Sequence, residues 1–239
     1  MKFMRNFFGS PAKKLHSIDD IEDYLHEEEG SAIAFFDKES ENMKKVYDEV
    51  AAELRTIGFY FGYVTDPKLR SEYPQYDNKI LYIRANLLNS VYEDKISIYQ
   101  ENLNTSSLQR WMIKEQQGLM GFRTSNNDYL FQNPLVVVYI PLILDFEYAA
   151  QATINTLRIR ENLMSVAQNY SEKVSFAISD KKQFKYELRN CGYDYNKIES
   201  SEPLVCMFRD EDRFNMKMKY SIEAFSEAID RFLAGSTQR

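Results

Sequence analysis

Few residues in this sequence could carry covalent or acid–base chemistry. It contains two cysteines, Cys191 and Cys206, and two histidines, His16 and His26. Neither histidine lies beside a cysteine or a credible pair of acids, so the pattern supports neither a nucleophilic triad nor a metal site. The sequence has no G-x-G-x-x-G motif and no phosphate-binding loop. We therefore expect no catalytic residue, no metal ion and no cofactor.

The two cysteines fall near the expected end of a helix and inside an expected core strand, respectively. Unpaired cysteine behaves as a small buried hydrophobic residue, so the favoured interpretation is two buried free thiols. A disulfide between Cys191 and Cys206 is the alternative. Two cysteines do not make the disulfide framework of a small secreted domain, so their number leaves the cellular compartment open.

Length and charge restrict the class of protein. The chain has 239 residues, enough for two compact domains. Residues 1–117 carry 15 basic and 20 acidic side chains, which argues against binding to nucleic acid. The longest apolar run, 135–144, is short and contains Pro141, so no membrane span is expected. Residues 1–9 lack the features of a signal peptide, which favours either a cytosolic protein or a piece of a longer secretory chain.

Hydrophobic periodicity divides the first half into alternating strands and helices. Ser31–Phe36 is a continuous apolar run, typical of a central strand that is covered on both faces. The other expected strands are Lys13–His16, Phe59–Val64, and a hairpin of Lys79–Arg84 with Ile96–Tyr99. The expected helices are Ile18–Glu28, Glu41–Ile57, a short helix from Pro67, and Ser106–Gln117.

The second half repeats this order, which indicates a divergent duplication. Its apolar central strand is Pro134–Ile140. The elements expected after it are a helix ending near Tyr170, a strand at Val174–Ile178, a helix at Lys182–Asn190, a hairpin of Leu204–Phe208 with Phe214–Lys219, and a helix from Ser221 to Leu233. The order βαβαβαββα is that of the thioredoxin fold, which by itself gives no function.

Several strings resemble the protein disulfide isomerase family. KFMRNFFGSPAKKL at Lys2–Leu15 resembles the junction after a redox-active domain of that family. In that family two inactive domains follow, called b and b′. Three strings resemble them, namely AIAFFDKES at Ala32–Ser40, PLVVVY at Pro134–Tyr139 and VAQNYSEKVSFAISDKKQF at Val166–Phe184. The resemblance implies an α/β fold of two tandem thioredoxin-like domains, each a five-stranded mixed sheet flanked by helices. Domain b is expected at residues 1–117 and b′ at 118–239.

Two kinds of family member fit best. DFEYAAQATINTLRIR at Asp145–Arg160 is similar to a long relative with three redox-active domains, whereas the region of Lys173 and Lys181 is similar to the isomerase that partners calnexin and calreticulin. Both imply the endoplasmic reticulum lumen. The resemblance implies a non-catalytic part that spaces redox-active domains and binds a lectin chaperone, another lumenal chaperone or unfolded glycoproteins through b′. A stand-alone thioredoxin-fold chaperone is the alternative.

The corner after each central strand is where a redox-active member of the family carries C-x-x-C. Here the two corners read Asp37-Lys38-Glu39-Ser40 and Pro141-Leu142-Ile143-Leu144, without a thiol. This predicts that neither domain exchanges disulfides.

Two protein-binding surfaces are expected in the second half. One is basic and is formed by Lys173, Lys181, Lys182 and Lys185, with Arg110 of the first half nearby. The resemblance implies that positions matching Lys173 and Lys181 receive the acidic tip of the calnexin arm, although lysines at such edges also serve as solubilising residues. The other surface is apolar, at the vacated corner, and comprises Pro141, Phe146 and Tyr148, for which core packing is the alternative.

Two tripeptides match the N-glycosylation pattern. They begin at Asn104 and Asn169. The pattern is common by chance and leaves occupancy open.

Overall fold

The computed structural model describes residues 10–25, 30–37, 40–143, 146–216 and 219–235. The chain divides into two compact units, Met1–Gln116 and Gln117–Arg239, and each is built on its own five-stranded sheet. We call them unit 1 and unit 2.

The sheet of unit 1 has the strand order β1-β3-β2-β4-β5. Its strands are β1 (Lys13–Lys14), β2 (Ser31–Phe35), β3 (Tyr60–Val64), β4 (Ile80–Ile83) and β5 (Ile96–Ile98). Strands β1, β3 and β2 run parallel, and β4 pairs antiparallel with both β2 and β5. All five residues of β2 are buried, which explains its continuous apolar sequence.

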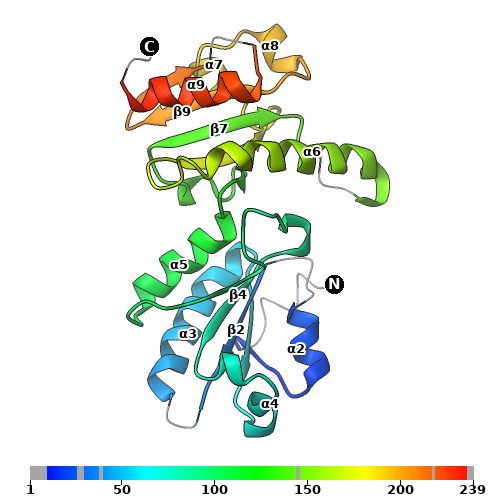
Figure 1. The fold of residues 1–239 in the computed structure, drawn as a ribbon, viewed down its shortest axis with the longest axis vertical. Helices are drawn as coiled ribbons and strands as arrows, with labels where there is room; N and C mark the ends of the chain where they lie inside the picture. Colours follow the sequence, from blue (N-terminus) through cyan, green and yellow to red (C-terminus); the bar gives the residue numbers. More distant parts are fainter. Residues whose placement is uncertain (1–9, 26–29, 38–39, 144–145, 217–218, 236–239) are drawn as a thin grey trace. The chain divides into compact units, whose positions relative to one another are not determined.

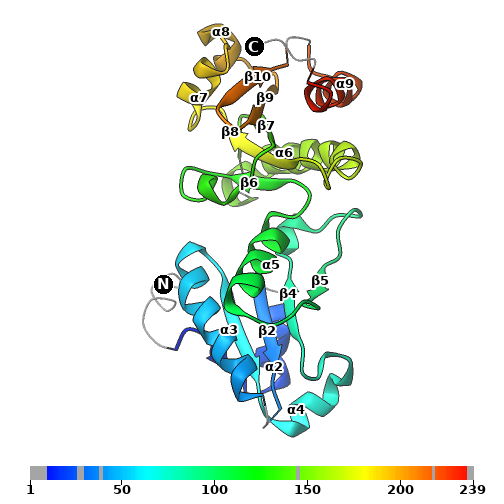
Figure 2. The same cartoon turned by 90° about the vertical axis from the view of Figure 1, so that its left-hand side faces the viewer.

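Helices cover both faces of this sheet, as Figures 1 and 2 show. The helices of unit 1 are α2 (Ile18–Leu25), α3 (Glu41–Leu54), α4 (Pro67–Glu72) and α5 (Thr105–Gln117), with short 3-10 turns at Arg55–Ile57, Pro74–Tyr76 and Asn86–Leu88. Residues of α3 and α5 share one core cluster, and residues of α2 and α4 pack on the other. Tyr47 of α3 is fully buried, and its hydroxyl donates to the carbonyl oxygens of Ala32 and Gly62 at 3.0 and 2.9 Å. This contact ties α3 to β2 and β3.

Unit 2 repeats the same strand order, with β6-β8-β7-β9-β10 across its sheet. Its strands are β6 (Gly121–Arg123), β7 (Leu135–Ile140), β8 (Ser175–Asp180), β9 (Leu204–Arg209) and β10 (Asp212–Asn215). Strands β6, β8 and β7 are parallel, while β9 runs antiparallel to β7 and β10. The fold predicted from sequence, two five-stranded mixed sheets flanked by helices, is therefore confirmed.

The helices of unit 2 also lie on two sides of the sheet (Figure 2). They are α6 (Phe146–Ala167), α7 (Lys185–Asn190), α8 (Tyr195–Glu199) and α9 (Ile222–Leu233), with a 3-10 turn at Asp128–Leu130. Helices α6 and α9 contact each other, whereas buried residues of α7 and α8 share a cluster with β7 and β9. Helix α7 ends at Asn190, as the sequence predicted, and Gly192 follows in the left-handed region at φ +90°.

Some details differ from the sequence-based expectation. Helix α8 was not predicted because it has only five residues, although Asp194 caps it by accepting a hydrogen bond from the Lys197 amide. Helix α2 is described only to Leu25, short of the predicted Glu28, and its Ile18 is 41% exposed while its Ile21 is fully buried.

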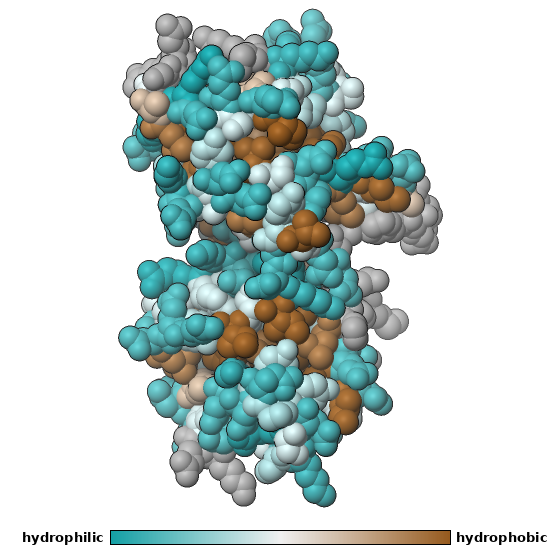
Figure 3. Space-filling view, viewed as in Figure 1, coloured by the Kyte–Doolittle hydropathy of each residue, from teal (hydrophilic) through white to brown (hydrophobic). Residues whose placement is uncertain are grey.

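The described helices do not combine the length and apolar character of a membrane span. On the face drawn in Figure 3, hydrophobic residues reach the surface in both units among many hydrophilic ones.

Candidate functional site

In the corner of unit 1, polar contacts hold Asp37 and Ser40, whereas Lys38 and Glu39 lie outside the described residues. The Asp37 amide and the Ser40 hydroxyl both donate to Oδ1 of Asn78, at 3.1 and 2.8 Å. Ser40 Oγ also donates to Asp37 Oδ1 at 2.6 Å, and Asn78 Nδ2 donates to Asp37 Oδ2 at 2.5 Å. Asn78 has a φ of +55°, a conformation that asparagine tolerates better than most residues. These contacts link the end of β2 to the loop before β4. Polar side chains therefore lie at the corner where a reactive thiol pair would otherwise be placed.

The corner of unit 2 is built differently. Pro141 is exposed, and the Leu142 amide donates to Oδ1 of Asp180 at 3.2 Å, which fixes the chain beside the end of β8. Helix α6 begins at Phe146. The side chains of Phe146 and Tyr148 lie outside the described residues, so the apolar surface predicted there stays a prediction.

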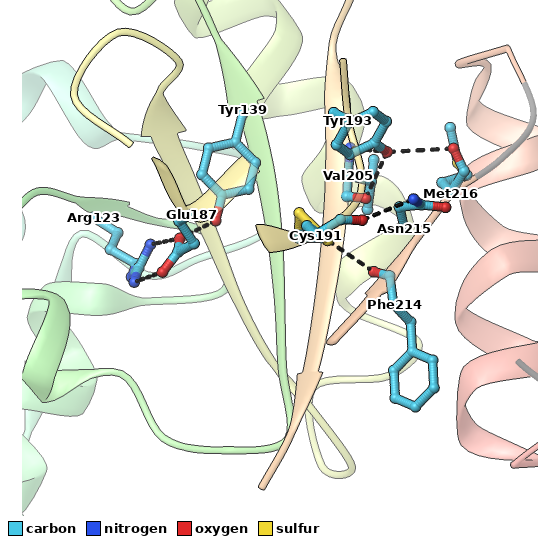
Figure 4. Close-up of a disulfide and its surroundings, with 10 residues drawn as sticks. Arg123, Tyr139, Glu187, Cys191, Tyr193, Val205, Phe214, Asn215 and Met216 are labelled. Carbon is cyan, nitrogen blue, oxygen red and sulfur yellow. Dashed lines mark hydrogen bonds and ion pairs between the residues drawn. A yellow bond between two sulfur atoms is a disulfide. The ribbon is translucent and has the colours of Figure 1, made fainter. Parts of the chain in front are cut away.

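Cys191 and Cys206 form a disulfide, so the favoured prediction of two free thiols is wrong and the alternative holds. Their Cα atoms are 6.3 Å apart, inside the usual range for a disulfide. Cys191 directly follows α7 and Cys206 lies in β9, and the two residues are 5% and 0% exposed. The disulfide is therefore a buried link between α7 and the sheet, shown in Figure 4, and it does not lie in either corner.

A buried ionic network holds the middle of α7 (Figure 4). Arg123 of β6 donates through Nη1 and Nη2 to the two carboxylate oxygens of Glu187 at 2.7 and 2.9 Å. The Tyr139 hydroxyl of β7 donates to the same carboxylate, and the Arg123 guanidinium lies 4.4 Å from the ring centroid of Phe184. Arg123 is 6% exposed. Nothing in the sequence marked these residues as partners, because 64 positions separate Arg123 from Glu187.

Tyr47 and Tyr139 are expected to stay protonated until the protein unfolds. Burial raises the pKa of both phenols well above the ordinary value of 10.0, and for Tyr139 the Glu187 carboxylate raises it further. Because the pKa of each phenol is higher in the folded chain than in the unfolded chain, these groups leave the folded state at full stability below pH 10.0. The free energy of unfolding then falls as the pH rises above that value. Phenolate absorbance should report these last ionisations together with loss of far-ultraviolet circular dichroism. Complete tyrosine ionisation in a folded chain would contradict this.

The predicted basic surface is not one cluster. Lys173 precedes β8 and Lys182 follows it, so the strand separates them by roughly 20 Å. Lys173, Lys182 and Lys185 are exposed. Arg110 is exposed as well, but it belongs to unit 1.

Lys181 is a correction to the predicted surface, because it is only 2% exposed. Its Nζ donates to the carbonyl oxygens of Lys197 and Ser200 at 3.3 and 2.9 Å, at the end of α8. Burial lowers the pKa of Lys181. The ammonium of Lys181 therefore holds a helix end inside unit 2 and is not presented to a partner.

Asn104 and Asn169 are both exposed. Asn104 caps α5, since its Oδ1 accepts from the Ser107 amide at 2.9 Å. Among the described residues, no group of three or more His, Cys, Asp or Glu side chains is placed to hold a metal ion.

Comparison with known proteins gives one consistent answer. A profile described as a thioredoxin-like domain matches residues 36–235. The "Probable protein disulfide-isomerase ER-60" of Schistosoma mansoni is 24% identical over 98% of this chain, which covers 46% of that relative. "Protein disulfide-isomerase A3" of Gallus gallus is 26% identical over 94% of this chain and 44% of the relative.

A solved structure has the same arrangement of elements. The "bb fragment of ERp72" matches with a TM-score of 0.77 and 19% identity, over 97% of this chain and all of that one. At this identity the likeness shows the fold. The chain spans less than half the length of the two curated relatives.

Proposed function

The chain belongs to the thioredoxin-like domain family, and from that premise we propose that it is the b and b′ pair of an endoplasmic-reticulum protein disulfide isomerase. In this role units 1 and 2 are non-catalytic. They space the redox-active domains of the whole protein, and unit 2 binds chaperones or unfolded glycoproteins. The relatives that match nearly all of this chain are named as disulfide isomerases, which supports the assignment.

The observation that carries the proposal is the absence of a free thiol among the two cysteines of the chain. Both are used in one buried disulfide, and neither corner has a cysteine in its sequence. A redox-active domain needs an accessible thiolate of lowered pKa beside a helix N-terminus. With no such thiol, the family's fold remains available as a scaffold for binding.

The partner we propose is a lectin chaperone with an acidic arm, such as calnexin or calreticulin. The resemblance of the Lys173 region to the isomerase that partners these chaperones supports this choice. The exposed cations of unit 2 provide a complementary charge, which speeds encounter and fixes orientation more than it adds affinity. Lys181 takes no direct part in this contact because its ammonium is buried.

Charge reversal tests this binding. Lys173→Glu and the double variant K182E/K185E are each expected to weaken binding of the isolated calnexin arm several-fold, mainly through slower association, as measured by surface plasmon resonance at low salt. Lys181→Met is expected to act through stability, so it should bind normally once folded. The exposed Lys68 of unit 1 offers a control, Lys68→Glu, that should leave affinity unchanged. Unchanged affinity in both unit 2 variants would contradict this choice of partner.

A further inference from the structure

Helix α7 and the turn before it have two chemically distinct sides. The inner side carries Phe184, Glu187, Leu188 and Cys191, all buried or partly buried. The outer side carries Lys182, Lys185, Tyr186 and Arg189, all exposed. These spacings of three and four residues place each set on one face of a helix. We call the second set the α7 outer face.

We propose that the α7 outer face is a docking surface for an extended acidic segment of a partner protein. This inference rests on the proposed function for the lumenal source of the partner. It adds the surface that binds the segment and the chemistry that recognises it. Tyr195, on the adjacent α8, is exposed as well.

The charge of this face is not neutralised within its own helix. Glu187 is the only acid of α7, and it turns inward to Arg123 and Tyr139. No ion pair is found for Lys185 or Arg189 among the described residues. The face therefore presents cations without a matching anion, which is the complement of a carboxylate-rich segment.

The aromatic residues distinguish this face from an ordinary solubilising one. Tyr186 is 68% exposed and Tyr195 is 62% exposed, and they lie on consecutive short helices. The ammonium of Lys185 lies 5.6 Å from the ring centroid of Tyr186. Tyrosine and arginine are the residue types that most often dominate binding energy in interfaces, because they combine apolar area with directed hydrogen bonds.

The surface is held rigid before any partner arrives. Glu187 is clamped by two hydrogen bonds from Arg123, the disulfide fixes the end of α7 to β9, and Lys181 holds the last carbonyls of α8. A preorganised surface loses little conformational entropy on binding, so few contacts suffice for measurable affinity.

Charge density favours a peptide over a nucleic acid or a membrane. The chain has a formal charge of −6, and the α7 outer face contributes only three cations. Neutralising about three phosphates gives weak, salt-sensitive binding to nucleic acid. A flexible acidic segment places a few carboxylates against this small face. It brings much less negative charge near the rest of this acidic chain than a nucleic acid or an anionic membrane would.

The test uses the whole chain and a fluorescein-labelled peptide of Glu and Asp residues with one central Phe, measured by fluorescence anisotropy. The double variant K185E/R189E should weaken binding at least about tenfold, and Tyr186→Ala about tenfold, whereas Tyr186→Phe keeps most of the affinity. A peptide with Gln and Asn in place of the acids should not bind. The matched control K45E/K68E changes two exposed lysines of unit 1 and the same number of charges, and it should bind like the wild type.

Each other outcome contradicts the inference. Equal losses in K45E/K68E and K185E/R189E would show a general charge effect, and binding of phosphatidylserine vesicles in preference to the peptide would assign the face to membranes. Circular dichroism checks that each variant is folded. Because the probe is synthetic, its failure to bind overturns the α7 surface alone, whereas failure of the calnexin arm with an intact peptide site overturns only the choice of partner.

Discussion

Reduction of the Cys191–Cys206 disulfide is expected to lower the free energy of unfolding of unit 2 by about 3 kcal/mol and to leave unit 1 unchanged. The disulfide closes a loop with a sequence separation of 15 residues. Opening it returns to the unfolded chain the conformational freedom that the cross-link removes, and a loop of this length contributes about 3 kcal/mol. The reduced thiols keep their buried positions, so little packing is lost.

The single tryptophan makes the two units separable in this experiment. Trp111 lies in α5 of unit 1, so its fluorescence reports on that unit. Urea unfolding followed by Trp111 fluorescence should coincide in the oxidised and reduced proteins, while circular dichroism should gain an earlier transition after reduction. The variant C191A/C206A should lose more than the reduced protein, because it also leaves a cavity. Identical circular dichroism curves for oxidised and reduced protein would refute the structural role of the disulfide.

Replacing Arg123 by Met is expected to cost unit 2 about 3 kcal/mol. The guanidinium is the bidentate partner of Glu187, and the two side chains are 8% and 22% exposed. Removing one member leaves a largely buried carboxylate without its cation, which costs more than the pair contributes when intact. Glu187 also positions α7, so the variant should loosen that helix.

Two comparison variants isolate this effect. R123M/Y139F/E187L removes both charges together with the Tyr139 hydroxyl that would lose its acceptor, and it should recover most of the lost stability, since apolar side chains of similar volume replace the ion pair. Arg231→Met breaks the exposed Arg231–Glu227 pair of α9, whose side chains are 54% and 53% exposed, and should change stability little. Chemical unfolding of the four proteins completes a comparison of buried and exposed pairs. A loss in R123M no larger than in Arg231→Met would rule out the buried pair as a fixing point of α7.

Local sequence predicted most of the fold because the elements are strongly patterned. Ser31–Phe36 and Pro134–Ile140 are apolar without interruption, as strands covered on both faces must be. Gly58 and Gly192, both with positive φ, end helical segments where the sequence placed the ends. The repeated order of elements then determined the topology of both sheets.

The site was predicted less well because long-range contacts decide it. Lys181 was expected on the surface, yet the carbonyl oxygens that bury it come from Lys197 and Ser200, at the end of a helix too short to show a period. Cys191 and Cys206 become neighbours only once α7 lies on β9. By contrast, the residues of the α7 outer face, such as Tyr186 and Arg189, are at helical spacing in the sequence. The face can be recognised only once the structure shows that Glu187 points inward.

The central claim of the proposed function is that this chain has no disulfide chemistry of its own and acts only by binding. Reduction of insulin by dithiothreitol, followed as turbidity, tests it most directly, with a thioredoxin domain containing C-x-x-C as the positive control. The account predicts that adding the chain leaves the rate equal to that without protein. Catalytic acceleration that disappears in C191A/C206A would contradict it, because the buried disulfide would then be a reactive one.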